Sequence, residues 1–204
     1  MAISKLTSLQ LDTLQEMSNI GVGHAASALS QLLRRRIDIR IPRVAVTPFK
    51  NAADGFGGPE TPVAAVALRM GGDATGHVIL LLEPDSARRL AGALTEGPGQ
   101  LADLSQPMAR SVLQEVGNIL ASAYLNALGQ LTGLVFLPSV PVFACDMVGA
   151  VVDTALIEQG EAGDVALVME TAFDVEGEAL AGQMLLLPSP VSLERIFRAV
   201  GVAL

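Results

Sequence analysis

The chain has 204 residues, of which 50% are hydrophobic, and its formal net charge at pH 7 is −8. This acidic balance argues against a nucleic-acid partner, which would require a basic stripe. No apolar run reaches the roughly 18–20 residues of a membrane-spanning helix, so we expect no membrane insertion.

The N-terminus and the cysteine content indicate the compartment. Residues 1–7 lack the charged segment, apolar block and cleavage site of a signal peptide. The single cysteine, Cys145, excludes an internal disulfide and a zinc site built from cysteines. We expect a cytoplasmic protein in which Cys145 is a buried structural thiol, in or near a strand.

A long amphipathic helix opens the chain. It is predicted to begin at Thr7 or Ser8, either of which can cap it, and to end near Arg35. The basic cluster Arg34-Arg35-Arg36 complements the negative end of the helix dipole, and a docking role for it is left open. A strand with period-two alternation follows over 37–41, Pro42 interrupts it, and residues 44–47 can resume it.

The rest of the first half reads as two strands and a helix. Strands over 62–70 and 77–82 are joined by a turn at 71–73, and a short helix begins at Pro84. Gly97-Pro98-Gly99 then marks a boundary between halves.

The second half repeats this order. Its predicted elements are a helix over 105–131 closed by Gly133, strands over 134–137, 140–144, 148–157, 165–173 and 179–187, and a terminal helix over 190–200. We therefore expect an α+β fold with an antiparallel or mixed sheet, formed by one domain of residues 1–204. Two pseudo-symmetric halves, about 1–97 and 98–204, would place both long helices on one exposed face.

The repeat is clearest in a short motif. Asp12-Thr13-Leu14-Gln15-Glu16-Met17-Ser18-Asn19-Ile20 returns 99 positions later as Ser111-Val112-Leu113-Gln114-Glu115-Val116-Gly117-Asn118-Ile119. A proline follows each asparagine at the same separation, Pro42 in the first copy and Pro141 in the second. This register makes coincidence improbable and indicates two structural half-repeats.

Each long helix is predicted to be two-faced, at about 100° per residue. The expected apolar stripes are Leu14, Met17, Gly21, Ala25, Ala28 and Leu32, and Leu113, Val116, Leu120, Ala123, Ala127 and Leu131. The opposite faces carry Asp12, Glu16, Asn19 and Gly23, and Ser111, Glu115, Asn118 and Ser122. Because asparagine is a poor helix former, its use on both polar faces indicates contact surfaces rather than plain solvation.

These motifs resemble the signature of the CheC/CheX/FliY phosphatases of bacterial and archaeal chemotaxis. The signature is an Asp or Ser, a Glu four residues later, an Asn three after that, and a Pro beyond 22 further residues, and this chain contains it twice. The resemblance extends over essentially the whole chain.

The resemblance implies a hydrolase that dephosphorylates the phospho-aspartate of a CheY-like response regulator. Asn19 and Asn118 would orient the attacking water, while Glu16 and Glu115 would pair with a lysine of the receiver domain. Asp12 and Ser111 would add a polar contact or be ordinary solvated positions, and Pro42 and Pro141 would be structural. The family implies no cofactor or metal of its own, with Mg²⁺ expected on the receiver, and it suggests CheD as a further partner.

The residues alone leave an alternative open. His24 and His77 are the only histidines, and neither has a metal-ligand partner at helical or hairpin spacing. The rival hypothesis is a non-catalytic adaptor or flagellar-switch module that binds the response regulator or CheD. Because both copies retain Glu and Asn, we expect two working sites whose amides stand clear of the hydrophobic interior, each beside its acidic companion.

Overall fold

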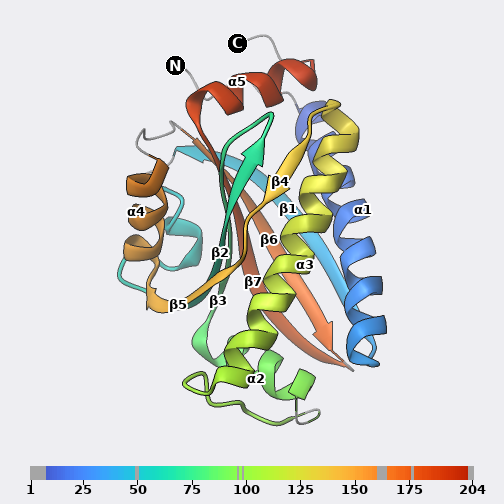
Figure 1. Cartoon of the computed structure of the whole chain (residues 1–204), viewed down its shortest axis with the longest axis vertical. Coiled ribbons are helices and arrows are strands. Elements are labelled where there is room, and N and C mark those ends of the chain that lie inside the picture. Colours follow the sequence, from blue (N-terminus) through green and yellow to red (C-terminus); the bar gives the residue numbers. More distant parts are fainter. Residues whose placement is uncertain are drawn as a thin grey trace.

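A computed structural model describes residues 8–48, 51–95, 97, 99–159, 165–175 and 177–201. Figure 1 shows the chain with its elements labelled. The helices are α1 (Ser8–Leu33), α2 (Pro84–Thr95), α3 (Pro107–Thr132), α4 (Val148–Gln159) and α5 (Pro190–Ala199), with a short 3₁₀ helix η2 (Asp54–Phe56). The strands are β1 (Ile37–Pro48), β2 (Pro62–Gly72), β3 (Gly76–Leu82), β4 (Phe136–Pro138), β5 (Val142–Met147), β6 (Val165–Val175) and β7 (Glu178–Pro188).

All these strands belong to one antiparallel sheet, in the order β1-β6-β7-β3-β2-β4, with β5 also pairing with β2. This order is symmetric about the β3–β7 junction. The first half contributes the β2–β3 hairpin and the second half the β6–β7 hairpin, whereas β1 pairs with β6 and both β4 and β5 pair with β2. The two halves are therefore interlocked within one sheet, and the predicted α+β class is confirmed.

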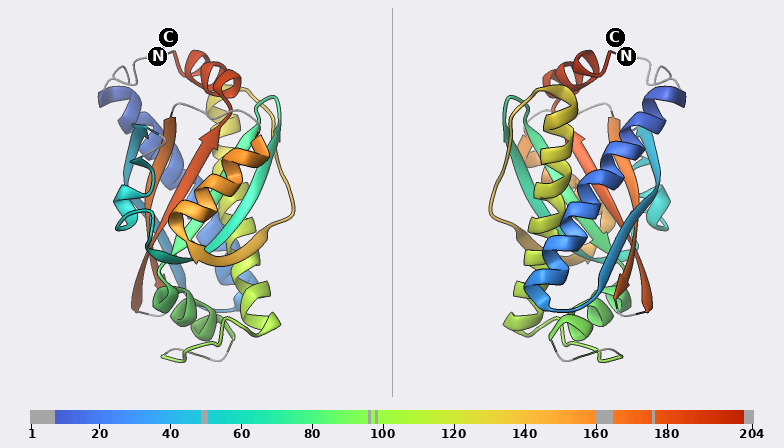
Figure 2. Two further views of the ribbon diagram at one scale, coloured as in Figure 1. Left: turned by 90° about the vertical axis from the view of Figure 1, so that its left-hand side faces the viewer. Right: turned by 90° about the vertical axis from the view of Figure 1, so that its right-hand side faces the viewer.

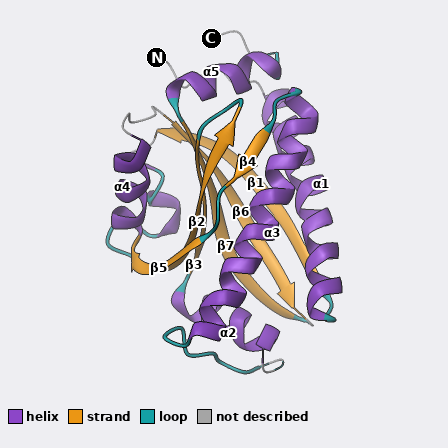
Figure 3. Cartoon of the chain, in the orientation of Figure 1, coloured by secondary structure: helices purple, strands orange, loops and turns teal. Residues whose placement is uncertain are grey.

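Two cores lie on opposite faces of the sheet, as period-two alternation requires. In β3, Val78, Leu80 and Leu82 join the core under α1 and α3, whereas Ile79 and Leu81 join the core under α4. Figures 2 and 3 show α4 on the face opposite the two long helices. Because both faces are covered there, every residue of β3 is buried.

Most predicted elements are confirmed, but the strand expected over 148–157 is wrong, because those residues form α4. Val148, Val151, Val152 and Ala155 are buried at the spacing of a helix, and the β-branched valines obscured that period. The predicted start Thr7 and the boundary residue Pro98 lie outside the described residues.

Pro42 interrupts the strand as expected: the pairing of β1 with β6 shifts register between Arg40 and Arg43, and β1 then continues to Pro48. Cys145 is exposed rather than buried, because β5 lies at the edge of the sheet and pairs only with β2. In the described part of the chain no helix has both the length and the apolar character to cross a membrane.

Candidate functional site on α1 and α3

The two long helices lie side by side in opposite directions across one face of the sheet (Figures 1 and 2). Glu16 and Glu115 are exposed, and Asn19 and Asn118 are half-buried. Both glutamates lack an ion-pair partner among the described residues. Each helix therefore presents a carboxylate to solvent one turn before a partly accessible carboxamide.

The buried side of α1 is broader than the predicted stripe. Gly21 and Ala25 are buried as expected, but Ala28 is exposed, and the side chains of Leu14, Met17 and Leu32 lie outside the description. The additional buried residues are Ser18, Val22, Ala26 and Leu29. The helix contacts both the sheet and α3, so two adjacent sides are covered, and half-buried Asn19 lies at the margin of the side that faces β1.

Gly21 sets the close approach of the helices. A Cβ atom at Gly21 would lie 2.9 Å from Ala127 Cβ and 3.0 Å from the Ala123 carbonyl oxygen. A side chain at this position would therefore push α1 away from α3. Gly23, by contrast, lies on the exposed side near Asn19, and a Cβ atom there would meet nothing within 4 Å.

A glutamine anchors each site helix to its proline. Gln15 Nε2 donates to the Pro42 carbonyl oxygen at 2.8 Å, and Gln114 Nε2 donates to that of Pro141 at 3.0 Å. The same bond thus recurs in both halves and fixes the turn of helix from which Glu16 and Glu115 project. These glutamines were not among the predicted site residues, although each precedes its glutamate at the same position of the repeat.

Asn19 makes a further contact that has no counterpart among the described residues of the second half. Its Oδ1 accepts from the Ile41 N–H at 2.8 Å, and its Nδ2 donates to the carbonyl oxygens of Ile41 (3.1 Å) and Gln15 (3.0 Å). Ile41 lies in the register shift of β1, where it has no partner in β6. The carboxamide therefore substitutes for the missing strand partner, as buried backbone groups require.

Asn118 is in a different state. Its side chain forms no hydrogen bond with the part of the chain that the structure describes. It lines a groove of about 290 Å³ between α1 and α3, together with His24, Ser122, Asn126 and Gln130. Neither amide is sealed in the interior, since both are half-buried, but Asn19 is bonded to the backbone of its own chain and Asn118 has no such bond to the described residues.

The remaining predicted residues lie at the margin. Asp12 and Ser111 are exposed, one helical turn before each glutamate, and make no hydrogen bond or ion pair with the described residues. Among those residues no group of three or more His, Cys, Asp or Glu side chains is placed to hold a metal ion. The site therefore offers a carboxylate and a hydrogen-bonding amide, without a nucleophile–base pair.

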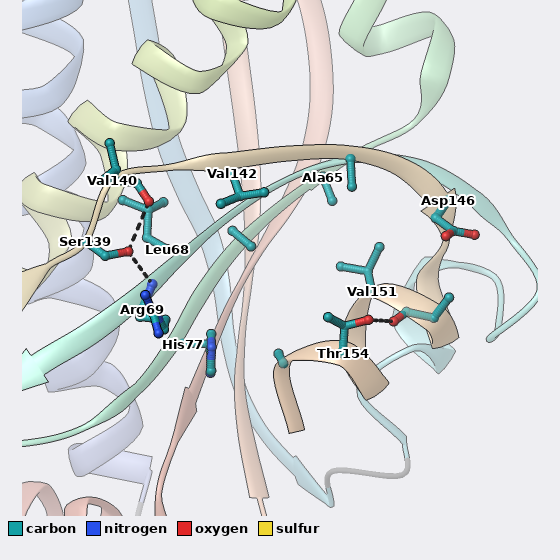
Figure 4. Close-up of a pocket in the computed structure, with 14 residues that line it drawn as sticks. Ala65, Leu68, Arg69, His77, Ser139, Val140, Val142, Asp146, Val151 and Thr154 are labelled. Atoms are coloured by element: carbon teal, nitrogen blue, oxygen red, sulfur yellow. Dashed lines mark hydrogen bonds between the residues drawn. The ribbon is translucent and has the colours of Figure 1, made fainter. Parts of the chain in front are cut away.

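A second cavity of about 370 Å³ lies on the opposite face of the sheet, between β2, β5 and α4 (Figure 4). Its lining is mostly apolar. Ser139 Oγ accepts from Arg69 N–H and donates to the Val140 carbonyl oxygen, and Thr154 donates to the Ala150 carbonyl oxygen. These hydroxyl groups are occupied by backbone partners, and neither Glu/Asn pair contributes to this cavity.

Known proteins resemble this chain in sequence and in fold. The model of the CheC-like family matches residues 9–46 and 108–144, which contain each Glu/Asn pair together with its proline. The chain is 41% identical over 199 residues to the CheY-P phosphatase CheC of Bacillus subtilis (strain 168), and the match covers 96% of this chain and 95% of that protein.

Flagellar motor switch proteins share part of this similarity. The flagellar motor switch phosphatase FliY of Bacillus subtilis is 31% identical over 131 residues, covering 64% of this chain but only 31% of that protein. The crystal structure of Thermotoga maritima FliY has the same fold, with a TM-score of 0.75 at 20% identity, covering 96% of this chain and 98% of that one. Through its near full-length similarity to CheC, the chain belongs to the CheC-like family.

Proposed function

We propose that the chain is a phosphatase that hydrolyses the phospho-aspartate of a CheY-like response regulator, and that the pair on α3 does most of this work. The support for a phosphatase is the relative named CheY-P phosphatase, at 41% identity over most of both chains. The support for the α3 pair is the contrast between Asn118, which has no bond to the described residues, and Asn19, which has three backbone bonds.

In the proposed reaction, water attacks the phosphorus of the acyl phosphate as the bond to the aspartate oxygen breaks. The products are an aspartate carboxylate, inorganic phosphate and the proton that the water releases. Phosphoryl transfer of this kind depends on positioning and charge neutralisation more than on covalent participation by the catalyst. The receiver domain supplies the phospho-aspartate, its own Mg²⁺ and a lysine, so the chain needs to contribute only orientation.

Asn118 is suited to that contribution because a carboxamide has both a donor and an acceptor and does not titrate. It can hold a water in line with the phosphorus without competing for its protons. Glu115, exposed one turn earlier on the same face, pairs with the receiver's lysine and fixes the docking register. Gln114 keeps this turn in place through its bond to the Pro141 carbonyl oxygen.

The first pair works less well under this proposal. Turning the Asn19 amide towards a water breaks both of its bonds to Ile41, a residue that is 1% exposed and has no strand partner in β6. Leaving a buried donor without a partner costs about 1–3 kcal/mol, equivalent to roughly a five- to 150-fold penalty on the active geometry. Glu16 remains exposed and can still dock a receiver.

The experiment that tests the proposal is the decay of a phosphorylated CheY-type receiver with and without the protein. We expect acceleration by the intact chain, a large loss for Asn118→Ala, and complete loss for the variant with both asparagines replaced. Folding of each variant is checked by circular dichroism. Binding of the receiver without any acceleration would overturn the phosphatase proposal in favour of the adaptor role.

A further inference from the structure

A pocket of about 560 Å³ lies on the face of the sheet opposite α1 and α3. Its floor is formed by β6 and β7, and the segment 51–61, which contains η2, forms one wall. Such a volume is typical of small-molecule sites, which span about 300–1,000 Å³. The pocket shares no lining residue with the cavity beside α4 or with the groove that contains Asn118.

Two polar side chains from neighbouring strands meet in this pocket. Glu170 of β6 and Gln183 of β7 lie directly opposite each other in the sheet. Both point away from α1 and α3, because the adjacent residues Met169 and Met184 belong to the core under those helices. The Cβ atoms of such a pair are about 5 Å apart. A carboxylate and a carboxamide therefore lie side by side.

The carboxamide of Gln183 has an acceptor that the chain leaves unused. Gln183 is only 7% exposed, and its Nε2 donates to the Gly55 carbonyl oxygen at 2.7 Å. This bond fixes the orientation of the amide, because a carbonyl oxygen accepts only from the NH₂ group. Oε1 is then buried without a hydrogen-bond partner among the described residues. Since buried acceptors are nearly always satisfied, this oxygen indicates a donor that comes from outside the chain.

Gly55 leaves room for such a donor. A Cβ atom at Gly55 would lie 3.1 Å from Gln183 Nε2 and 3.6 Å from Gln183 Oε1. Apart from the adjoining residues of the loop, the three atoms closest to that position all belong to Gln183. The missing side chain therefore opens a gap beside the amide, and a methyl group would fill it.

The charges around the pocket favour a cation. The charged residues that line it are Glu83, which is exposed, and Glu170. Arg43 pairs with Glu170 at 3.5 Å, but the arginine is 70% exposed, and such pairs are weak because water and salt screen them. Arg40 and Arg43 lie on β1, and neither lines the pocket. Phe56 adds an aromatic ring, whose face attracts cations.

We propose that this pocket binds a small organic cation that carries an ammonium group. The ammonium donates to Gln183 Oε1 and to the Glu170 carboxylate, and its alkyl part lies over Ala172 and Ala181, the next pair of β6 and β7. A metal ion is less well served, because the described residues contain no group of three or more His, Cys, Asp or Glu side chains that could hold one. This site goes beyond the proposed phosphatase activity and is tested without a receiver.

The probe is n-butylammonium chloride, added at constant ionic strength and followed by two-dimensional amide NMR of the isotope-labelled protein. We expect the backbone amides of Gly55 and Gly57 and the side-chain amide of Gln183 to shift together, with a Kd of about 1 mM. Neutral n-butanol has the same chain without the charge and should bind at least about tenfold more weakly.

Matched variants separate the site from general attraction to an acidic protein. Gly55→Ala fills the gap beside the amide, and Gln183→Leu removes the acceptor, so each should weaken binding at least about tenfold. Glu170→Gln keeps the shape without the charge and should raise the Kd about threefold to tenfold. The control, Asp153→Asn, removes an exposed carboxylate of α4 and should bind like the wild type.

Circular dichroism checks that each variant is folded, and if Gln183→Leu does not fold, Gly55→Ala decides alone. Lost binding in folded Gly55→Ala, with unchanged binding in Asp153→Asn, would support the site. Equal shifts from n-butanol, or binding that Gly55→Ala leaves intact, would overturn the proposal. An absence of shifts at Gly55 would mean that only water satisfies Gln183 Oε1, and would overturn it as well.

Discussion

Replacing Asn19 with alanine should destabilise the protein, whereas the same change at Asn118 should not. Without Asn19 Oδ1, the Ile41 N–H loses an acceptor at 2.8 Å. Ile41 is 1% exposed, so water cannot readily take the place of that acceptor. An unsatisfied buried donor costs about 1–3 kcal/mol. A loss of about 2 kcal/mol would lower the melting temperature of a chain of this size by about 4–8 °C.

Asn118→Ala is the matched comparison. It breaks no hydrogen bond to the described residues and replaces a poor helix former with the best one. Its free energy of unfolding should therefore stay unchanged or rise by about 0.5 kcal/mol. Far-UV circular dichroism during urea and thermal unfolding measures both variants under identical conditions. Equal destabilisation by the two substitutions would refute the assigned difference between the two amides.

Three further outcomes are expected. Gly21→Ala should lower the free energy of unfolding in urea by about 1–3 kcal/mol, because its Cβ would lie 2.9 Å from that of Ala127. The control Gly23→Ala, whose Cβ would meet nothing within 4 Å, should raise the free energy of unfolding by about 0.4–1 kcal/mol. Gln114→Leu should lower kcat of phosphate release while circular dichroism shows a folded protein, since it removes the bond that holds the Glu115 turn; an unchanged kcat would contradict this. Burial raises the pKa of Tyr124 above the ordinary 10.0, so its stabilising contribution is complete below that value and is lost at more alkaline pH. Tyr124 is the one tyrosine of the chain, so phenolate absorbance reports on it alone and should appear together with unfolding. Ionisation of Tyr124 in the folded protein would contradict the raised pKa.

The sequence supported a good part of this account. Repetition of Glu, Asn and Pro at one spacing located both pairs, and amphipathic periodicity located both long helices. The glutamine anchors could also have been predicted, because Gln15 and Gln114 share one position of the repeat. They were overlooked because a glutamine in a helix is usually an ordinary solvated residue.

The inequality of the two amides could not be predicted in this way. It depends on a register shift in β1 that leaves Ile41 without a strand partner, and register is set by pairing with β6, more than 100 residues away. The α4 helix was missed for a related reason. Its valines favour a strand locally, and only packing on the far face of the sheet makes their helical spacing decisive.

The most direct test of the account is the initial rate of phosphate release from a phosphorylated CheY-type receiver in the presence of the Asn118→Ala and Asn19→Ala variants. The account predicts that the wild type speeds release, that Asn118→Ala loses most of this acceleration, and that folded Asn19→Ala keeps most of it. Greater loss from Asn19→Ala than from Asn118→Ala would contradict it.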